Sequence, residues 1–301
     1  MELRQLTYFV KAAEMSHFTD AAAMLYITQS TLSQQIKQLE NELGMLLFDR
    51  IGKHVQLTEA GRVFLQHARQ ILLDVDKGKQ AIQDLQQVLR GELRIGSTYA
   101  FTSLLLPALT TFPVKYPGIK IYVEYGTTAA LERKLRASEL DLVLAFHQDV
   151  FGADLNMREL FRSKMVVVVS KKNKLAGLKK ISLQNLNGMD LIFPSFGFSA
   201  RDSLDEVLKS NKIQPAVKIE MNDIHSILKL VEKGHWATLL NERALLGWKN
   251  LVAIPVEGRE LQRRAYVIWQ KGIYRKKAAD LFTEELWKGM QEDGIQPGIH
   301  R

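Results

Sequence analysis

Residues 18–50, FTDAAAMLYITQSTLSQQIKQLENELGMLLFDR, hold the pattern that decides the fold of this 301-residue chain. Its first part carries Ala21, Ala22 and Ala23, small residues that let two helices pack closely. After a short turn at residues 26–29, a second helix is expected, with Thr28 or Ser30 as its N-cap. Its apolar face repeats every three or four residues, at Leu32, Ile36, Leu39 and Leu43. The stretch therefore predicts two short helices joined by a tight turn.

The polar face of the second helix differs from an ordinary solvent-exposed surface. It carries Ser, Thr, Gln and one Lys, where exposed helices usually carry Glu and Lys. Gln can pair bidentately with adenine, and Ser or Thr can bond several base edges or phosphates. Periodicity alone leaves two interpretations open, a DNA-recognition helix and a polar surface helix of a three-helix bundle. The candidate DNA-binding residues on this face are Thr28, Gln29, Ser30, Thr31, Ser33, Gln34 and Lys37.

The segments on either side of this pair extend the pattern. An amphipathic helix is expected over residues 2–15, and Gly44 is expected just past the C-terminal end of the recognition helix. Residues 46–57 predict two short strands around a turn, which is the pattern of a wing. Lone basic residues in a turn are usually only solvated, but beside a recognition helix they can meet phosphates or the minor groove. The wing candidates are Arg50, Lys53 and His54.

The run 18–50, followed by Leu57-Thr58-Glu59-Ala60-Gly61, resembles the winged helix-turn-helix of LysR-type bacterial transcriptional regulators. Many positions of the family pattern AA…L…TQS…LS.QI..LE.ELG..LF.R…LT.AG are filled at fixed spacing over about 60 residues. The resemblance implies that Gln29, Ser33, Gln34 and the wing basics contact DNA. Many members of the family have Arg where this chain has Gln34, so the base preference at that position does not carry over.

Net charge does not by itself explain DNA binding in this chain. The whole chain carries a formal charge of +8, but residues 1–90 hold ten Lys or Arg and ten Asp or Glu residues and are neutral. The excess of basic residues lies entirely in residues 91–301. DNA binding is therefore argued from the local placement of side chains and not from a basic domain.

A long helix is expected from Thr58 to about Leu89, and its apolar residues follow a heptad pattern. Such a helix would be roughly 45 Å long, too long to be buried inside a small domain. Two interpretations are open, a helix packed on its own C-terminal domain and a dimerisation helix, and the narrow seam favours the second. The expected dimerisation residues are Phe64, Ala68, Ile71, Val75, Ile82, Leu85 and Leu89.

After residue 91 the pattern changes to strands alternating with helices, which indicates a parallel βαβαβ unit and then a second α/β unit. The expected fold class is α/β overall, with a winged helix-turn-helix, a long linker helix and a two-lobed effector domain that resembles periplasmic binding proteins. The expected domains are a DNA-binding domain at 1–60, a linker and dimerisation helix at 61–90, and an effector-binding domain at 91–301. Lobe I covers about 91–162 and 265–301, and lobe II about 163–264.

In open α/β sheets, ligands bind beyond the carboxyl ends of the strands, where helix N-termini favour anions. Hydroxyl groups and Arg201 at these ends suggest a small carboxylate or other anion, and the Phe residues suggest an apolar body. Each residue also has an ordinary structural explanation, as a helix cap, a core residue or an ion-pair partner. The expected effector-binding residues are Ser97, Thr98, Tyr99, Ala100, Thr127, Thr128, Phe146, His147, Phe196, Phe198, Ser199 and Arg201.

Several classes of function lack support in the sequence. The absence of cysteine excludes disulfides, thiolate catalysis and thiol redox sensing. The seven histidines form no HExxH or paired metal spacing, and no P-loop, G-x-S-x-G or G-x-G-x-x-G motif is present. No apolar run approaches the ~18 residues of a membrane span, and the N-terminus lacks the apolar core of a signal peptide. We therefore expect a cytoplasmic protein with no catalytic residue, metal or cofactor.

The sequence predicts a ligand-responsive LysR-type regulator that binds double-stranded promoter DNA as a homodimer or homotetramer. A small-molecule effector, expected to be anionic, would bind between the lobes, and RNA polymerase is a candidate further partner. The alternative is a two-lobed solute-binding protein or enzyme whose N-terminal helices serve only assembly. The identity of the effector, the target promoters, and the choice between activation and repression lie beyond the sequence.

Overall fold

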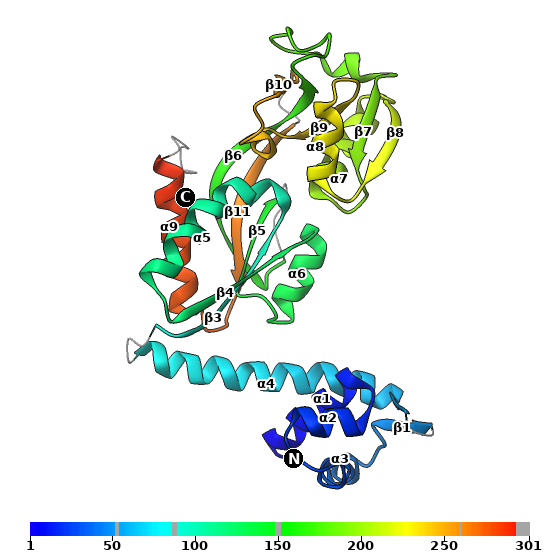
Figure 1. The fold of residues 1–301 in the computed structure, drawn as a ribbon, viewed down its shortest axis with the longest axis vertical. Helices are drawn as coiled ribbons and strands as arrows, with labels where there is room; N and C mark the ends of the chain where they lie inside the picture. Colours follow the sequence, from blue (N-terminus) through cyan, green and yellow to red (C-terminus); the bar gives the residue numbers. More distant parts are fainter. Residues whose placement is uncertain (52–53, 86–88, 148–151, 259–260, 293–301) are drawn as a thin grey trace. The chain divides into compact units, whose positions relative to one another are not determined.

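The computed structural model describes residues 1–51, 54–85, 89–147, 152–258 and 261–292, and the chain divides into two compact units, residues 1–86 and 87–301 (Figure 1). The first unit holds three helices, a two-stranded hairpin and a long helix. These are α1 (Leu3–Met15), α2 (Phe18–Met24), α3 (Gln29–Leu43), β1 (Phe48–Ile51), β2 (His54–Leu57) and α4 (Glu59–Leu85). The expected recognition helix and wing strands are therefore present at their expected places.

The ends of α3 follow directly from its sequence. The Thr28 hydroxyl accepts a hydrogen bond from the Thr31 backbone N–H at 3.1 Å and caps the helix. Gly44 closes it with φ of 70°, a left-handed conformation that glycine adopts without a steric penalty. Beyond it, buried Glu40 accepts the backbone N–H groups of Leu47 and Phe48 at 2.9 and 3.2 Å. This carboxylate ties the start of the wing to the recognition helix.

The core of the first unit changes the expected role of α4. Ala68 is fully buried, and Phe64 and Ile71 pack against the core that α1, α2 and α3 form. The expected seam is therefore wrong at Ala68, because a side chain enclosed by its own unit cannot face a partner. Leu89 likewise packs against the core of the second unit. Val75 and Ile82 lie outside both cores, Ile82 with 59% of its surface exposed, and the side chain of Leu85 lies outside the described residues.

The second unit is built on two lobes whose sheets share long strands. In lobe I, β3 lies parallel to β4 and β5, and β11 lies antiparallel to β5 and β6. In lobe II, β7 lies parallel to β8 and β9, and β6 lies antiparallel to β9 and β10. The strands are β3 (Gly91–Ser97), β4 (Ile119–Tyr125), β5 (Leu142–His147), β6 (Leu155–Ser170), β7 (Asp190–Pro194), β8 (Ala216–Met221), β9 (Ala237–Asn241), β10 (Leu251–Pro255) and β11 (Gln262–Gln270).

Helices cover both faces of each sheet because both faces of the central strands are apolar. In β5, Leu144 faces the core under α5 and α9, while its neighbour Val143 faces the core under α6. In β6, Val167 and Val168 divide in the same way between a core that includes α7 residues and one that includes α8 residues. The helices are α5 (Thr102–Lys115), α6 (Thr128–Arg136), α7 (Ser199–Ser210), α8 (Ile224–Glu232) and α9 (Lys277–Glu292).

Two features of this unit differ from the expected elements. The expected strand at 165–169 is the second half of a 16-residue strand, β6, which runs beside β11 from one lobe into the other (Figure 1). Helix α7 is absent from the expected elements, although Leu204, Val207 and Leu208 are buried at helical spacing. The two crossovers between the lobes were expected and are present.

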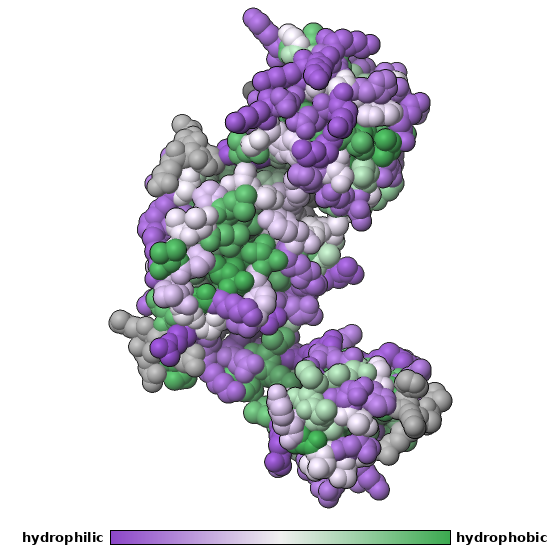
Figure 2. Space-filling view, in the orientation of Figure 1, coloured by the Kyte–Doolittle hydropathy of each residue, from purple (hydrophilic) through white to green (hydrophobic). Residues whose placement is uncertain are grey.

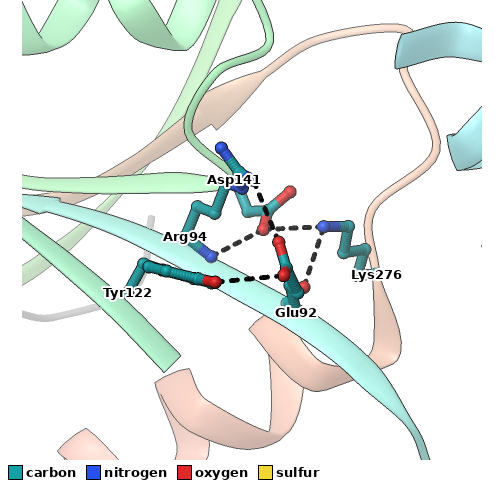
Figure 3. Close-up of polar contacts among 5 residues, drawn as sticks. All are labelled: Glu92, Arg94, Tyr122, Asp141 and Lys276. Carbon is teal, nitrogen blue, oxygen red and sulfur yellow. Dashed lines mark hydrogen bonds and ion pairs between the residues drawn. The ribbon is translucent and has the colours of Figure 1, made fainter. Parts of the chain in front are cut away.

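A polar cluster fixes the first strand of the second unit (Figure 3). Lys276 donates to the backbone carbonyl of Glu92 and to the Asp141 carboxylate, both at 2.9 Å. The same Asp141 oxygen accepts the Arg94 backbone N–H at 2.8 Å, and the Tyr122 hydroxyl donates to Glu92 at 3.2 Å. The cluster joins β3, β4 and the segment before α9, so we assign it a structural role.

The surface of the second unit is uneven in polarity. Figure 2 shows mostly hydrophilic side chains over lobe II and a hydrophobic patch over the part of lobe I that contains α5. Leu106 and Val114 of α5 are 56% and 81% exposed. Among the described residues, no helix is long and apolar enough to cross a membrane.

Candidate effector cleft and nucleic-acid surface

A cleft between the two lobes lies where several helices of the second unit begin. Residues 98–100 precede α5, Thr127 caps α6, and residues 198–200 and 224 begin α7 and α8. The cleft holds about 490 Å³ of space that is partly open to solvent. Its lining residues are Thr98, Tyr99, Ala100, Gly126, Thr127, Phe146, Met165, Phe198, Ala200, Ile224, Leu240, Asn241, Ala244 and Arg263.

The expected effector-binding residues fall into three groups. Six line the cleft, namely Thr98, Tyr99, Ala100, Thr127, Phe146 and Phe198. Four do not line it, namely Ser97, Thr128, Phe196 and Arg201. The side chains of the remaining two, His147 and Ser199, lie outside the described residues. Expecting ligands at the carboxyl ends of the strands therefore located the cleft but overstated its membership.

Three of the four excluded residues have structural explanations. Ser97 is fully buried, and its hydroxyl donates to the Thr98 carbonyl at 3.0 Å. Phe196 is 68% exposed, and its ring lies 4.2 Å from the Arg201 guanidinium carbon. Thr128 follows the α6 cap, and its buried hydroxyl makes no hydrogen bond with the described residues. All three are corrections to the expected site.

Arg201 is the most important correction, because it was the expected anion ligand. Its Nε donates to the Asp205 carboxylate at 2.7 Å, and its Nη1 donates to Glu220 at 2.8 Å and to the Pro194 carbonyl at 3.1 Å. Burial alone would lower the pKa of Arg201, but these carboxylates outweigh it and raise the pKa. The guanidinium is thus neutralised by its own lobe.

Arg263 is the cation that does line the cleft. It is 3% exposed, and it shares a face of β11 with buried Ala265. Burial lowers the pKa of Arg263 to about 10, against a weaker opposing effect of Asp202. A lowered pKa means that the wall of the cleft does not fully compensate this charge. The available signal was the period-2 pattern of residues 262–270, which places an Arg on the buried face of a strand.

Two polar side chains in the lining also have unused hydrogen-bonding capacity. The Asn241 carbonyl oxygen accepts from the Ser163 hydroxyl and from the Arg243 backbone N–H, both at 3.0 Å. Its amide nitrogen Nδ2 is buried and has no partner among the described residues. The hydroxyl of Thr98 is in the same state. Asn241, like Arg263, was not among the expected residues.

The positive ends of the lobe II helices are partly occupied by their own carboxylates. Asp223 accepts the Ser226 backbone N–H at 2.9 Å, and the hydrogen bonds from Ser226 lower its pKa. Asp202 in the first turn of α7 accepts the Gly197 N–H at 3.2 Å. Tyr99, also in the lining, has a raised pKa because of its burial and the nearby Asp223 and Tyr125. The phenol of Tyr99 is therefore neutral and can donate a hydrogen bond.

The candidate nucleic-acid surface lies on the first unit and is exposed. Thr28, Gln29, Ser30, Thr31, Gln34 and Lys37 are exposed, and Ser33 is half-buried. Gln29, Gln34 and Lys37 make no hydrogen bond to other described residues, whereas the Thr28 hydroxyl lies 2.9 Å from that of Ser30 and 2.8 Å from that of Thr31. The side chains of Arg50, Lys53 and His54 lie outside the described residues.

Tyr26, in the turn before α3, is a surface residue that the expected set omits. It is 96% exposed and has φ of 55°, the left-handed region that bulky residues rarely adopt. Such a conformation is strained, and strain of this kind gathers at functional sites. The described residues contain no group of three or more His, Asp or Glu that could hold a metal ion.

Comparisons with known proteins cover almost the whole chain. Residues 3–62 match the bacterial regulatory helix-turn-helix protein, lysR family, and residues 86–291 match the LysR substrate binding domain. A probable RuBisCO transcriptional regulator of Thalassiosira pseudonana is 32% identical over 95% of this chain and 96% of that protein. The transcriptional activator CmpR of Synechocystis is 31% identical, covering 95% and 94%. Full-length OxyR from Pseudomonas aeruginosa superposes with a TM-score of 0.73 at 25% identity, covering 95% and 94%.

Proposed function

The chain belongs to the LysR family of bacterial transcriptional regulators, and from that premise we propose that a small anion held by Arg263 in the interlobe cleft controls its binding to promoter DNA. The alternative of a solute-binding protein or enzyme leaves the winged helix-turn-helix unexplained. The relatives are named as regulators, so we propose a regulatory protein of the cytoplasm and not an enzyme.

The observation that carries this proposal is the buried guanidinium of Arg263 in a largely apolar cleft. Taking a charge out of water is costly unless an opposite charge accompanies it. The lowered pKa of Arg263 indicates that the cleft without ligand compensates the charge only in part. Arg201, the other buried arginine near α7, already has two carboxylates. An anion in the cleft would supply to Arg263 what Asp205 and Glu220 supply to Arg201.

On the DNA side, we propose that the exposed face of α3 reads base edges. Gln29 and Gln34 are exposed and unpaired within the described residues, and Gln suits adenine. Lys37 on the same face would contact a phosphate. Arg50, Lys53 and His54 of the wing stay predicted phosphate or minor-groove contacts. Because residues 1–90 have no net charge, a single copy should bind weakly, and two copies are needed for a pseudo-palindromic site.

Assembly into a homodimer or homotetramer supplies the second copy. The remaining seam residues on α4, Val75 and Ile82, are not consumed by either core, and the exposed apolar face of α5 offers further surface. A ligand that binds one arrangement of the lobes better than another shifts the population toward it. In an oligomer, this shift changes the spacing of the recognition helices and so couples the cleft to DNA.

A thermal-shift titration of the full chain tests the anion site. Small carboxylates and phosphate esters would be added to the wild type, to Arg263→Met, and to Arg264→Met, an exposed arginine on the same strand. An anion at about 100 times its dissociation constant should add about 2.7 kcal/mol of stability to the wild type and to Arg264→Met. Arg263→Met should show none of this. Equal stabilisation of all three proteins would contradict the proposal.

A further inference from the structure

The three polar groups of the cleft lining differ in what they offer to a ligand. Arg263 brings a charge, and Asn241 and Thr98 bring donors with no partner among the described residues. Asn241 and Thr98 are 4% and 8% exposed, so water does not satisfy these donors from bulk solvent. A buried donor without a partner is rare in folded proteins, and a bound molecule commonly explains it. This part of the inference rests on the proposed anion site.

The orientation of the Asn241 amide is fixed by its surroundings. Its oxygen accepts two hydrogen bonds, one from the Ser163 hydroxyl and one from the Arg243 backbone N–H. A flipped amide would place its NH₂ group against the Arg243 N–H, so the network assigns the oxygen and the nitrogen without ambiguity. Asn241 therefore presents a donor, and not an acceptor, to the cleft side of β9.

Thr98 is held just as firmly. Its backbone N–H donates to the Leu144 carbonyl at 3.0 Å, and its carbonyl accepts from the Phe101 N–H and the Ser97 hydroxyl. These bonds fix the position from which its side chain projects into the wall. One lobe thus supplies the hydroxyl and the other the amide, while β11, which runs between the lobes, supplies the cation.

The remaining lining limits the charge of the ligand. Apart from Arg263, the fourteen lining residues carry no ionisable group except the phenol of Tyr99. The N-termini of α7 and α8 are already occupied by Asp202 and Asp223. A dianion would leave one negative charge uncompensated in a wall made mostly of Met, Phe, Ile, Leu and Ala, which is unfavourable. A monoanion matches the single cation.

We propose that the cleft is specific for a small monocarboxylate with a compact apolar body. Arg263 neutralises the charge, Asn241 and Thr98 donate to the carboxylate oxygens, and the apolar wall receives the rest of the molecule. A carboxylate presents about four lone-pair sites on two oxygens, which suits these donors. Both donors come from opposite lobes, so the ligand joins the lobes together when it binds.

The test uses ligands that share a body and differ in the head group. Benzoate, benzamide and phenyl phosphate present a monoanionic carboxylate, a neutral amide and a phosphate on one ring, and pentanoate, pentanamide and butyl phosphate do so on a chain. Isothermal titration calorimetry of the full chain should give at least tenfold tighter binding for a carboxylate than for its amide or phosphate. Tighter binding of the phosphates would overturn the proposed specificity while leaving the anion site at Arg263 intact.

Two substitutions test the donors. Thr98→Val removes the hydroxyl at constant shape, and Thr128→Val is its matched control, because Thr128 also has an unpaired buried hydroxyl but does not line the cleft. Thr98→Val should weaken carboxylate binding about tenfold to a hundredfold without lowering the melting temperature. Thr128→Val should leave carboxylate binding unchanged. Equal affinity of wild type and Thr98→Val for the carboxylates would contradict the role of this hydroxyl.

Asn241→Asp gives the sharper result. The aspartate keeps one oxygen for Ser163 and the Arg243 N–H but replaces the donor with a second acceptor. This variant should lose carboxylate binding and gain measurable affinity for the matched amide, whose NH₂ group can donate to it. A folded Asn241→Asp protein that still binds the carboxylate as the wild type does would overturn the proposal. If no carboxylate or phosphate binds the wild type, the proposed anion site fails as well.

Discussion

The recognition surface on α3 and the cleft of the second unit reach function by opposite physical routes. Gln29, Gln34 and Lys37 stand in water, where a polar side chain costs the fold nothing. Arg263, Asn241 and Thr98 are buried, and their unused charge and donors cost stability until a ligand arrives. Function is therefore written into exposed composition in the first unit and into an energetic deficit in the second.

The contrast between Arg201 and Arg263 makes the same point within one unit. Both guanidiniums are buried, yet neighbouring carboxylates raise the pKa of Arg201, and burial lowers that of Arg263. A buried cation with its partners stabilises a fold, and one that awaits a ligand destabilises it. Burial alone thus does not distinguish a structural arginine from a binding one.

The largest effect on stability is expected from removing the paired arginine. Arg201→Met breaks three hydrogen bonds and leaves Asp205 and Glu220 without their cation, although both are partly exposed. Urea unfolding of the full chain should show a loss of about 1–3 kcal/mol. Arg263→Met should lose nothing and gain up to about 2 kcal/mol. A loss of stability in Arg263→Met as large as in Arg201→Met would remove the distinction drawn between the two arginines.

A smaller effect is expected at Tyr26, where the exposed recognition unit departs from its own rule. Asn tolerates the left-handed conformation better than Tyr, so Tyr26→Asn should raise the stability of the first unit by about 1 kcal/mol. The same change should weaken DNA binding, because the exposed phenol lies beside the start of α3. Gel-shift titration and thermal unfolding would measure both. Unchanged DNA affinity would assign the strain at Tyr26 no role in binding.

The first unit could be predicted almost completely from the sequence because its signals are local. Thr28 and Gly44 mark the ends of α3, and the apolar repeat marks its buried face. The seam on α4 was predicted less well, because spacing cannot tell an apolar residue that meets a partner from one, such as Ala68, that covers its own core. That distinction depends on contacts with residues distant in sequence.

The cleft could be located but not populated from the sequence. Strand ends and helix starts identified Thr98, Thr127 and Phe198 correctly as members of the lining. Arg263 and Asn241 come from strands whose pairing joins residues about 80 to 120 positions apart, and no local pattern predicts that pairing. Likewise, the two carboxylates that occupy Arg201 are set by the packing of α7 against β8.

The central claim is that an anion on Arg263 controls how the chain binds DNA. Fluorescence anisotropy on the DNA upstream of its own gene would be measured for wild type, Arg263→Met and Arg264→Met. Each protein would be titrated with and without the carboxylate that binds the wild type most tightly. The account predicts saturable binding by all three, with the carboxylate changing the DNA affinity of wild type and Arg264→Met severalfold and leaving Arg263→Met unaffected. The same ligand response in Arg263→Met would contradict it.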